Sequence, residues 1–104
     1  MIESLSNARI KNVIKLMTSS RARREQGLFA VEGEKMFLEA PPHRIESVFI
    51  SEDYLNRHKA PEKCSYEVVT DAVYRKLSDT VSPQGILCVV RSEECSFKEL
   101  IGDF

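Results

Sequence analysis

The sequence predicts a single α/β domain in which a small central sheet is covered by helices on both faces. Short apolar segments alternate with amphipathic ones along the chain, the order typical of a layered α/β fold. One segment, Ile86–Val90, is apolar without interruption, as expected for a strand buried on both faces. The 104 residues, 42% hydrophobic and 30% charged, suffice for one modest core. Because helices separate the strands, we expect a largely parallel sheet, with a mixed sheet as the alternative.

The first predicted element is an amphipathic helix near the N-terminus. Ser6 is its expected N-cap, because a hydroxyl there can accept a hydrogen bond from the first helical turn. The apolar residues that follow have helical spacing, at Ile10, Val13, Ile14 and Met17.

The remaining elements alternate between strand and helix. A strand is predicted at Leu28–Glu32, and a short helix runs from Gly33 until Pro41-Pro42 stops it. The next predicted elements are a strand at Ile45–Ile50, a short helix capped by Ser51 that ends near Pro61, and a strand at Tyr66–Val69. A helix is then predicted to begin at Thr70-Asp71 and to end near Ser78. A loop over 79–85 leads to the last predicted strand, Ile86–Val90.

Charge is unevenly distributed along the chain. Residues 1–24 carry a net charge of +5 and the rest carry −6, although the chain as a whole has a formal charge of −1. A basic leading segment on an acidic body is the pattern expected for local contact with a polyanion. A solvated helix face would produce the same pattern, so charge alone leaves both interpretations open.

Five cations in this segment are candidate RNA contacts. Arg21, Arg23 and Arg24 lie in the predicted connection between the first helix and the first strand, and their planar heads suit phosphate oxygens. Lys11 and Lys15 could extend the surface along the first helix. Few aromatic residues accompany them, which favours recognition of folded RNA by backbone and shape over base stacking. An acidic protein partner is the alternative.

Patterns for catalysis are missing from the sequence. There is no glycine-rich phosphate loop, and His43 and His58 stand far apart without ligand-spaced partners, so we predict surface histidines and no metal site. Ser82 has no neighbouring base in sequence. Glu32 ends an apolar strand, and we predict that it accepts hydrogen bonds from backbone N–H groups of the following turn.

The cysteines and the N-terminus indicate a reducing compartment. Cys64, Cys88 and Cys95 form no Cys-x-x-Cys pair, and Cys88 is predicted to be a core residue. The N-terminus lacks a signal-peptide pattern, and no apolar stretch approaches the roughly 20 residues that span a bilayer. We expect a cytoplasmic protein.

A set of motifs resembles one known family across residues 2–91. The chain is similar to the N-terminal substrate-binding domain of the SpoU (TrmH-like) RNA ribose 2′-O-methyltransferases. The matching residues are Ile2, Ser4, Asn7-Ala8-x-Ile10-Lys11, Leu16, Ser20, Glu25, Phe29-Ala30-Val31-Glu32-Gly33, Glu39-Ala40 and Pro83-Gln84-Gly85-Ile86. Family members often have proline after the asparagine, where this chain has Ala8.

The resemblance implies a fold and a role. The fold would be a three-layer α/β/α sandwich like that of ribosomal protein L30e, and the domain would hold ribosomal or transfer RNA. A separate knotted domain would bind S-adenosylmethionine and transfer the methyl group, so this chain alone would not be catalytic. Residues 1–91 would be the RNA-binding domain and residues 92–104 the start of a linker. Lys11, Lys15, Arg21, Arg23 and Arg24 would face RNA, as would Gln84, while Gly33 and Gly85 would serve backbone geometry.

Two alternatives to this interpretation stay open. The chain could be a complete, stand-alone RNA-binding protein of the L30e/L7Ae kind, or a module whose arginines meet an acidic protein. The family dimerises mainly through its catalytic domain, so the parent enzyme would be a homodimer and the isolated domain a monomer.

Overall fold

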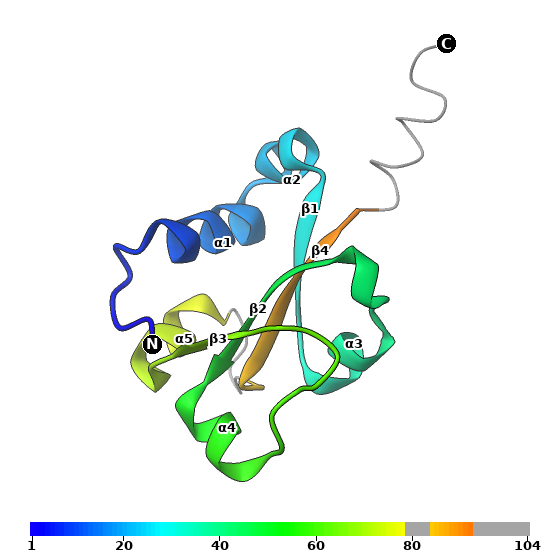
Figure 1. The fold of residues 1–104 in the computed structure, drawn as a ribbon. Helices are drawn as coiled ribbons and strands as arrows, with labels where there is room; N and C mark the ends of the chain where they lie inside the picture. Colours follow the sequence, from blue (N-terminus) through cyan, green and yellow to red (C-terminus); the bar gives the residue numbers. More distant parts are fainter. Residues whose placement is uncertain (79–83, 93–104) are drawn as a thin grey trace.

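A four-stranded mixed sheet organises the computed structural model, which describes residues 1–78 and 84–92 (Figure 1). The strand order is β1–β4–β2–β3. The strands are β1 (Leu28–Glu32), β2 (Ile45–Ser51), β3 (Glu67–Val69) and β4 (Ile86–Arg91). Strand β4 runs antiparallel to both of its neighbours, whereas β2 and β3 pair in parallel. The α/β class is therefore confirmed, and the sheet takes the mixed form of the two that we considered.

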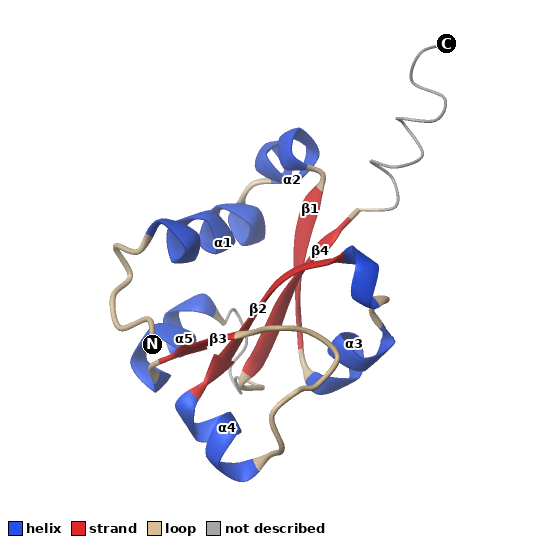
Figure 2. Cartoon of the chain, viewed as in Figure 1, coloured by secondary structure: helices blue, strands red, loops and turns tan. Residues whose placement is uncertain are grey.

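Helices cover both faces of the sheet and make three layers (Figure 2). They are α1 (Ala8–Thr18), α2 (Ser20–Gln26), α3 (Glu34–Glu39), α4 (Glu52–Arg57) and α5 (Asp71–Leu77), with a single 3-10 turn at Pro42–Arg44. Helices α1 and α5 contribute to one core cluster, and α3 and α4 contribute to the other.

Strand β4 supplies side chains to both cores. Leu87 and Val89 pack on the side of α1 and α5, whereas Ile86, Cys88 and Val90 pack on the side of α3 and α4. All five residues are at most 5% exposed, which confirms the strand buried on both faces and the core position of Cys88. A continuous apolar run is thus explained by a central position, although this strand is antiparallel to its neighbours.

Three predicted helix caps can be compared with the structure. Ser51 and Thr70 accept from the backbone N–H groups of Tyr54 (3.1 Å) and Val73 (3.2 Å), as predicted. The N-cap of α1, however, is Asn7, whose Oδ1 accepts from the Arg9 N–H at 2.9 Å, so the assignment to Ser6 was wrong by one residue. An Asn side chain reaches the backbone N–H two residues ahead as effectively as a serine does.

Gly33 and Gly85 have backbone conformations that disfavour other residues, as predicted. Their φ angles are +109° and +89°. A Cβ at position 85 would lie 2.7 Å from the Cβ of Tyr54, so this turn also depends on close approach to α4.

Parts of two predicted segments lie outside the described residues. These are residues 79–83 of the loop, including Ser82, and residues 93–104 of the expected linker, including Cys95. Among the described residues, no helix has the length and apolarity needed to cross a membrane.

Candidate nucleic-acid interface

The arginine-rich segment forms a helix, α2, where we expected a connection. Ser19 alone separates it from α1 and caps both helices. The Ser19 N–H donates to the Lys15 carbonyl at the end of α1 (2.9 Å), and the Ser19 hydroxyl accepts from the Ala22 N–H at the start of α2 (3.1 Å). Gly27 ends α2 in a left-handed conformation, with φ of 67°. The serine and glycine at its two ends were the available signals for this helix, but it lacks the apolar periodicity on which the prediction relied.

Two polar tethers join α2 to α1. Arg23 Nη1 donates to the Leu16 carbonyl at 2.6 Å. The amides of Asn12 and Gln26 exchange two hydrogen bonds, of 3.0 and 2.8 Å. Sequence reasoning missed Asn12 and Gln26, because a contact between residues 14 apart on two helices has no local signature.

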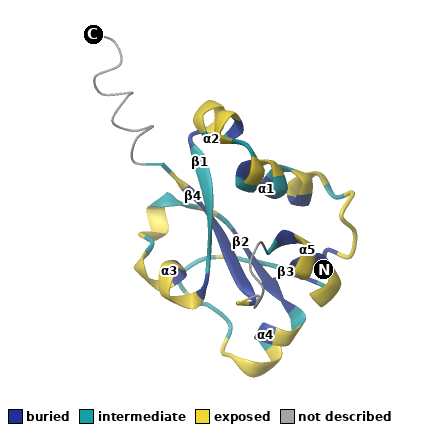
Figure 3. Cartoon of the chain, turned by 180° about the vertical axis from the view of Figure 1, so that it is seen from behind, coloured by how far each residue is buried: buried dark blue, intermediate teal, exposed yellow. Residues whose placement is uncertain are grey.

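Three of the predicted cations are exposed and have no hydrogen-bond or ion-pair partner among the described residues: Lys11, Lys15 and Arg24. Lys11 and Lys15 lie one turn apart on α1, away from its buried residues, which are Ile10, Val13 and Leu16. The outward surface of α2 is also largely exposed (Figure 3). These side chains are therefore accessible to a polyanion.

Arg21 and Arg23 have carboxylate or carbonyl partners. Arg21 Nε donates to Glu25 Oε1 at 2.7 Å, one turn along α2, but the Arg21 side chain remains 82% exposed. An ion pair this exposed is weak and can exchange for a phosphate. Arg23 is half-buried, and its guanidinium points to the end of α1. The structure thus distinguishes three arginines that the sequence presents as equivalent.

Gln84 lies apart from these cations. It precedes β4, whereas the Ser92 N–H just after β4 donates to the Gly27 carbonyl at the end of α2 (2.8 Å). The six residues of β4 separate the two ends by roughly 20 Å of extended strand. Gln84 is exposed, but it does not share one continuous site with the arginines of α2.

Glu32 has a structural role, with partners different from those predicted. Its carboxylate accepts from the Tyr74 hydroxyl (2.7 Å), the Ser78 hydroxyl (2.8 Å) and the backbone N–H of Gln84 (3.0 Å). The prediction of a structural carboxylate agrees with this network. The prediction that its donors belong to the following turn was wrong, because Tyr74 and Ser78 at the end of α5 and Gln84, two residues before β4, converge on the end of β1.

The same network affects Tyr74. Burial, and secondly the hydrogen bond to Glu32, raises the pKa of the Tyr74 hydroxyl well above its ordinary value. The neutral phenol is therefore retained, and it acts as a fixed donor between α5 and β1.

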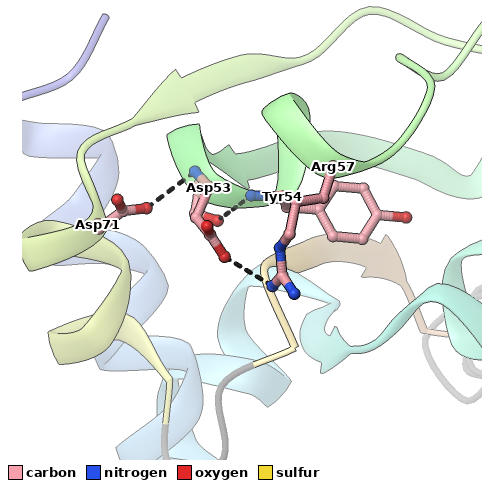
Figure 4. Close-up of polar contacts among 5 residues, drawn as sticks. Asp53, Tyr54, Arg57 and Asp71 are labelled. Atoms are coloured by element: carbon pink, nitrogen blue, oxygen red, sulfur yellow. Dashed lines mark hydrogen bonds and ion pairs between the residues drawn. The ribbon is translucent and has the colours of Figure 1, made fainter.

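A polar cavity of about 370 Å³ lies between α4 and α5, near Gly85. Asp71 accepts from the Asp53 N–H (3.0 Å), and Asp53 pairs with Arg57 (2.6 Å), as Figure 4 shows. The Asp71 carboxylate thus joins α5 to α4, and the Asp53 carboxylate pairs within α4.

Metal-binding clusters are missing from the described part of the chain. His43 and His58 are exposed, as predicted, and the His58 ring stacks on Tyr54 with centroids 4.2 Å apart. Among the described residues, α1 and α2 carry the exposed cations Lys11, Lys15, Arg21 and Arg24.

Comparisons relate this chain to known proteins. Residues 7–88 match the model of the MRM3-like substrate binding domain. A search of curated proteins found no match. The structure is similar to an RNA 2′-O ribose methyltransferase, with TM-score 0.70 and 26% identity over 89% of this chain and 38% of that one.

Two further solved structures share the fold. One is an rRNA methyltransferase from Sinorhizobium meliloti, with TM-score 0.66 and 19% identity over 88% of this chain and 36% of that one. The other, assigned to the TrmH family of RNA methyltransferases, comes from Porphyromonas gingivalis, with TM-score 0.63 and 20% identity over 86% of this chain and 36% of that one. The chain thus spans less than two fifths of the length of these structures.

Proposed function

Because this chain belongs to the family of MRM3-like substrate-binding domains, we propose that it is the RNA-binding domain of an RNA 2′-O-ribose methyltransferase acting on ribosomal or transfer RNA. The observation that best supports this proposal is a group of exposed cations on α1 and α2 that have no hydrogen-bond or ion-pair partner among the described residues: Lys11, Lys15 and Arg24. Arg21 would join them by exchanging Glu25 for a phosphate. Gln84 belongs to the same proposal as a weaker contact, since it lies at the far end of β4, whereas Arg23 points inward to the Leu16 carbonyl.

In this proposal the domain binds the sugar–phosphate backbone of the RNA. The exposed side chains of α2 are polar or charged, and Phe29 of the following strand packs against the core, so α1 and α2 carry no aromatic platform for bases. Each phosphate neutralised would steepen the dependence of log K on log salt by about 0.9 for duplex regions and 0.7 for single strands. Recognition would therefore depend on the shape of folded RNA.

We assign methyl transfer to a separate domain of the parent enzyme. Residues 1–91 would form the substrate-binding domain, and residues 92–104 would lead toward the catalytic domain that holds S-adenosylmethionine. The related Sinorhizobium meliloti enzyme has been solved with this cofactor bound, and its chain is much longer than this one. The parent would be a cytoplasmic homodimer, a location supported by the free thiols of Cys64 and Cys88.

Charge reversal provides the test. The variant Lys11→Glu/Lys15→Glu/Arg24→Glu should weaken binding to labelled total tRNA or deproteinised ribosomal RNA at least tenfold in a fluorescence titration, and should flatten its salt dependence. The control, Lys35→Glu/Arg75→Glu/Lys76→Glu, makes the same change in charge on exposed cations of α3 and α5.

The control should retain most of the affinity. Equal losses in both variants would show that net charge alone, and no surface on α1 and α2, governs binding. Pull-down from lysate that survives nuclease treatment, without measurable RNA affinity of the purified chain, would favour the acidic protein partner.

A further inference from the structure

The three arginines of α2 have three different surroundings. Arg24 is exposed, without a hydrogen-bond or ion-pair partner among residues 1–78 and 84–92, and Arg21 is exposed beside Glu25. Arg23 alone is half-buried, with Nη1 2.6 Å from the Leu16 carbonyl oxygen. To reach a phosphate, Arg23 would have to give up this bond.

The Leu16 carbonyl is an acceptor that α1 cannot satisfy by itself. It lies in the last turn of α1, where carbonyl groups have no N–H partner within the helix. A guanidinium at this end supplies a donor and also a positive charge at the negative end of the helix dipole. Arg23 therefore completes α1 while it holds α2 against it.

The Asn12–Gln26 pair provides a second tether without any charge. Its two hydrogen bonds connect the middle of α1 to the last residue of α2. Apolar packing contributes little here, because Ala22 is the one residue of α2 that is buried. A seven-residue helix is also marginal on its own. The polar tethers consequently decide how α2 sits on α1.

From this geometry we infer that Arg23, Asn12 and Gln26 are positioning residues, which fix α2 on α1 so that the cations of both helices form one rigid surface for the RNA backbone. The inference rests on the proposed function and deepens it. Without the tethers α2 would sample several orientations, and the apparent affinity would fall by the fraction of molecules in the competent one. Arg23 acts through the Leu16 carbonyl and contributes no phosphate contact.

The same substitution at neighbouring positions tests this assignment. Arg23→Met and Arg24→Met each remove one positive charge from α2 but keep an unbranched apolar stem. Arg23→Met should weaken RNA binding about three- to tenfold with an unchanged salt slope, whereas Arg24→Met should reduce the slope by about 0.7 to 0.9. Arg23→Lys, which keeps a donor and the charge, should restore most of the affinity.

Asn12→Ala keeps the inference testable if Arg23→Met unfolds the domain. It changes no charge, and it should also weaken binding to labelled tRNA several-fold with the slope unchanged and the circular dichroism spectrum retained. A slope reduced by Arg23→Met as much as by Arg24→Met would overturn the inference, as would full affinity in both Arg23→Met and Asn12→Ala. A failed proposed function looks different, since then Arg24→Met would change neither affinity nor slope.

Discussion

Removing the Glu32 carboxylate should destabilise this domain far more than removing an exposed carboxylate. Glu32 ends β1 and accepts from the hydroxyls of Tyr74 at 2.7 Å and Ser78 at 2.8 Å. It also accepts from the Gln84 N–H at 3.0 Å. The substitution Glu32→Ala deletes an acceptor that joins β1 to α5 and to the segment before β4.

The size of the effect follows from burial and charge. Tyr74 is 2% exposed, so water cannot easily replace the carboxylate as the acceptor of its proton. Hydrogen bonds to a charged group contribute about 1.5–3 kcal/mol each, and those of neighbouring donors are not additive. We expect Glu32→Ala to lower the free energy of unfolding by roughly 3–5 kcal/mol, a large part of the 5–15 kcal/mol typical of a domain.

Urea unfolding followed by circular dichroism measures this loss. The control is Glu46→Ala, which also removes a strand carboxylate, one bonded by Arg91 Nε (3.2 Å) and Nη2 (3.0 Å) on an exposed surface. That change should cost about 1 kcal/mol or less. If the two variants lose the same stability, the Glu32 network does not hold these elements together.

Three further outcomes are expected. Gly85→Ala should lower the free energy of unfolding in urea by about 3 kcal/mol or more, because its Cβ would lie 2.7 Å from that of Tyr54 and φ is +89°. A variant as stable as the wild type would contradict the turn geometry. Lys63→Met should lower stability by about 1–3 kcal/mol, since Lys63 Nζ donates to the Ala40 carbonyl just past α3 (2.9 Å), and an unchanged thermal midpoint would refute this. Burial raises the pKa of the Cys88 thiol from 9.0 to about 11. Its contribution to the free energy of unfolding is therefore complete below pH 9 and declines by about 3 kcal/mol between pH 9 and 11. Cys88→Ala should flatten that decline when unfolding is measured across this pH range.

Local chemistry in the sequence was sufficient for most of the elements. Thr70 and Ser51 act as caps because a short side-chain oxygen reaches an N–H only two or three residues away, an interaction written entirely in neighbouring residues. The uninterrupted apolar segment 86–90 likewise required a central strand, because no exposed or half-exposed position accommodates five apolar side chains in a row. The motifs of the substrate-binding family were also visible at this level.

Helix α2 could not be predicted from the sequence pattern. Its formation depends on a serine, a glycine and one buried alanine, and short helices gain most of their stability from the tertiary surface on which they pack. From the sequence we therefore predicted a connection at residues 20–26, whereas the structure has a helix that directs each arginine side chain differently.

Sequence alone determined the order of the strands and of the helices other than α2, the core position of Cys88 and a basic leading segment, since each depends on residues close together in the chain. Tertiary structure decided that β4 runs antiparallel between β1 and β2, that donors from α5 and from the segment before β4 converge on Glu32, and that Arg23 points to Leu16 while Arg24 is exposed. Those features join residues from different elements, and their free energies depend on distances that no local pattern encodes.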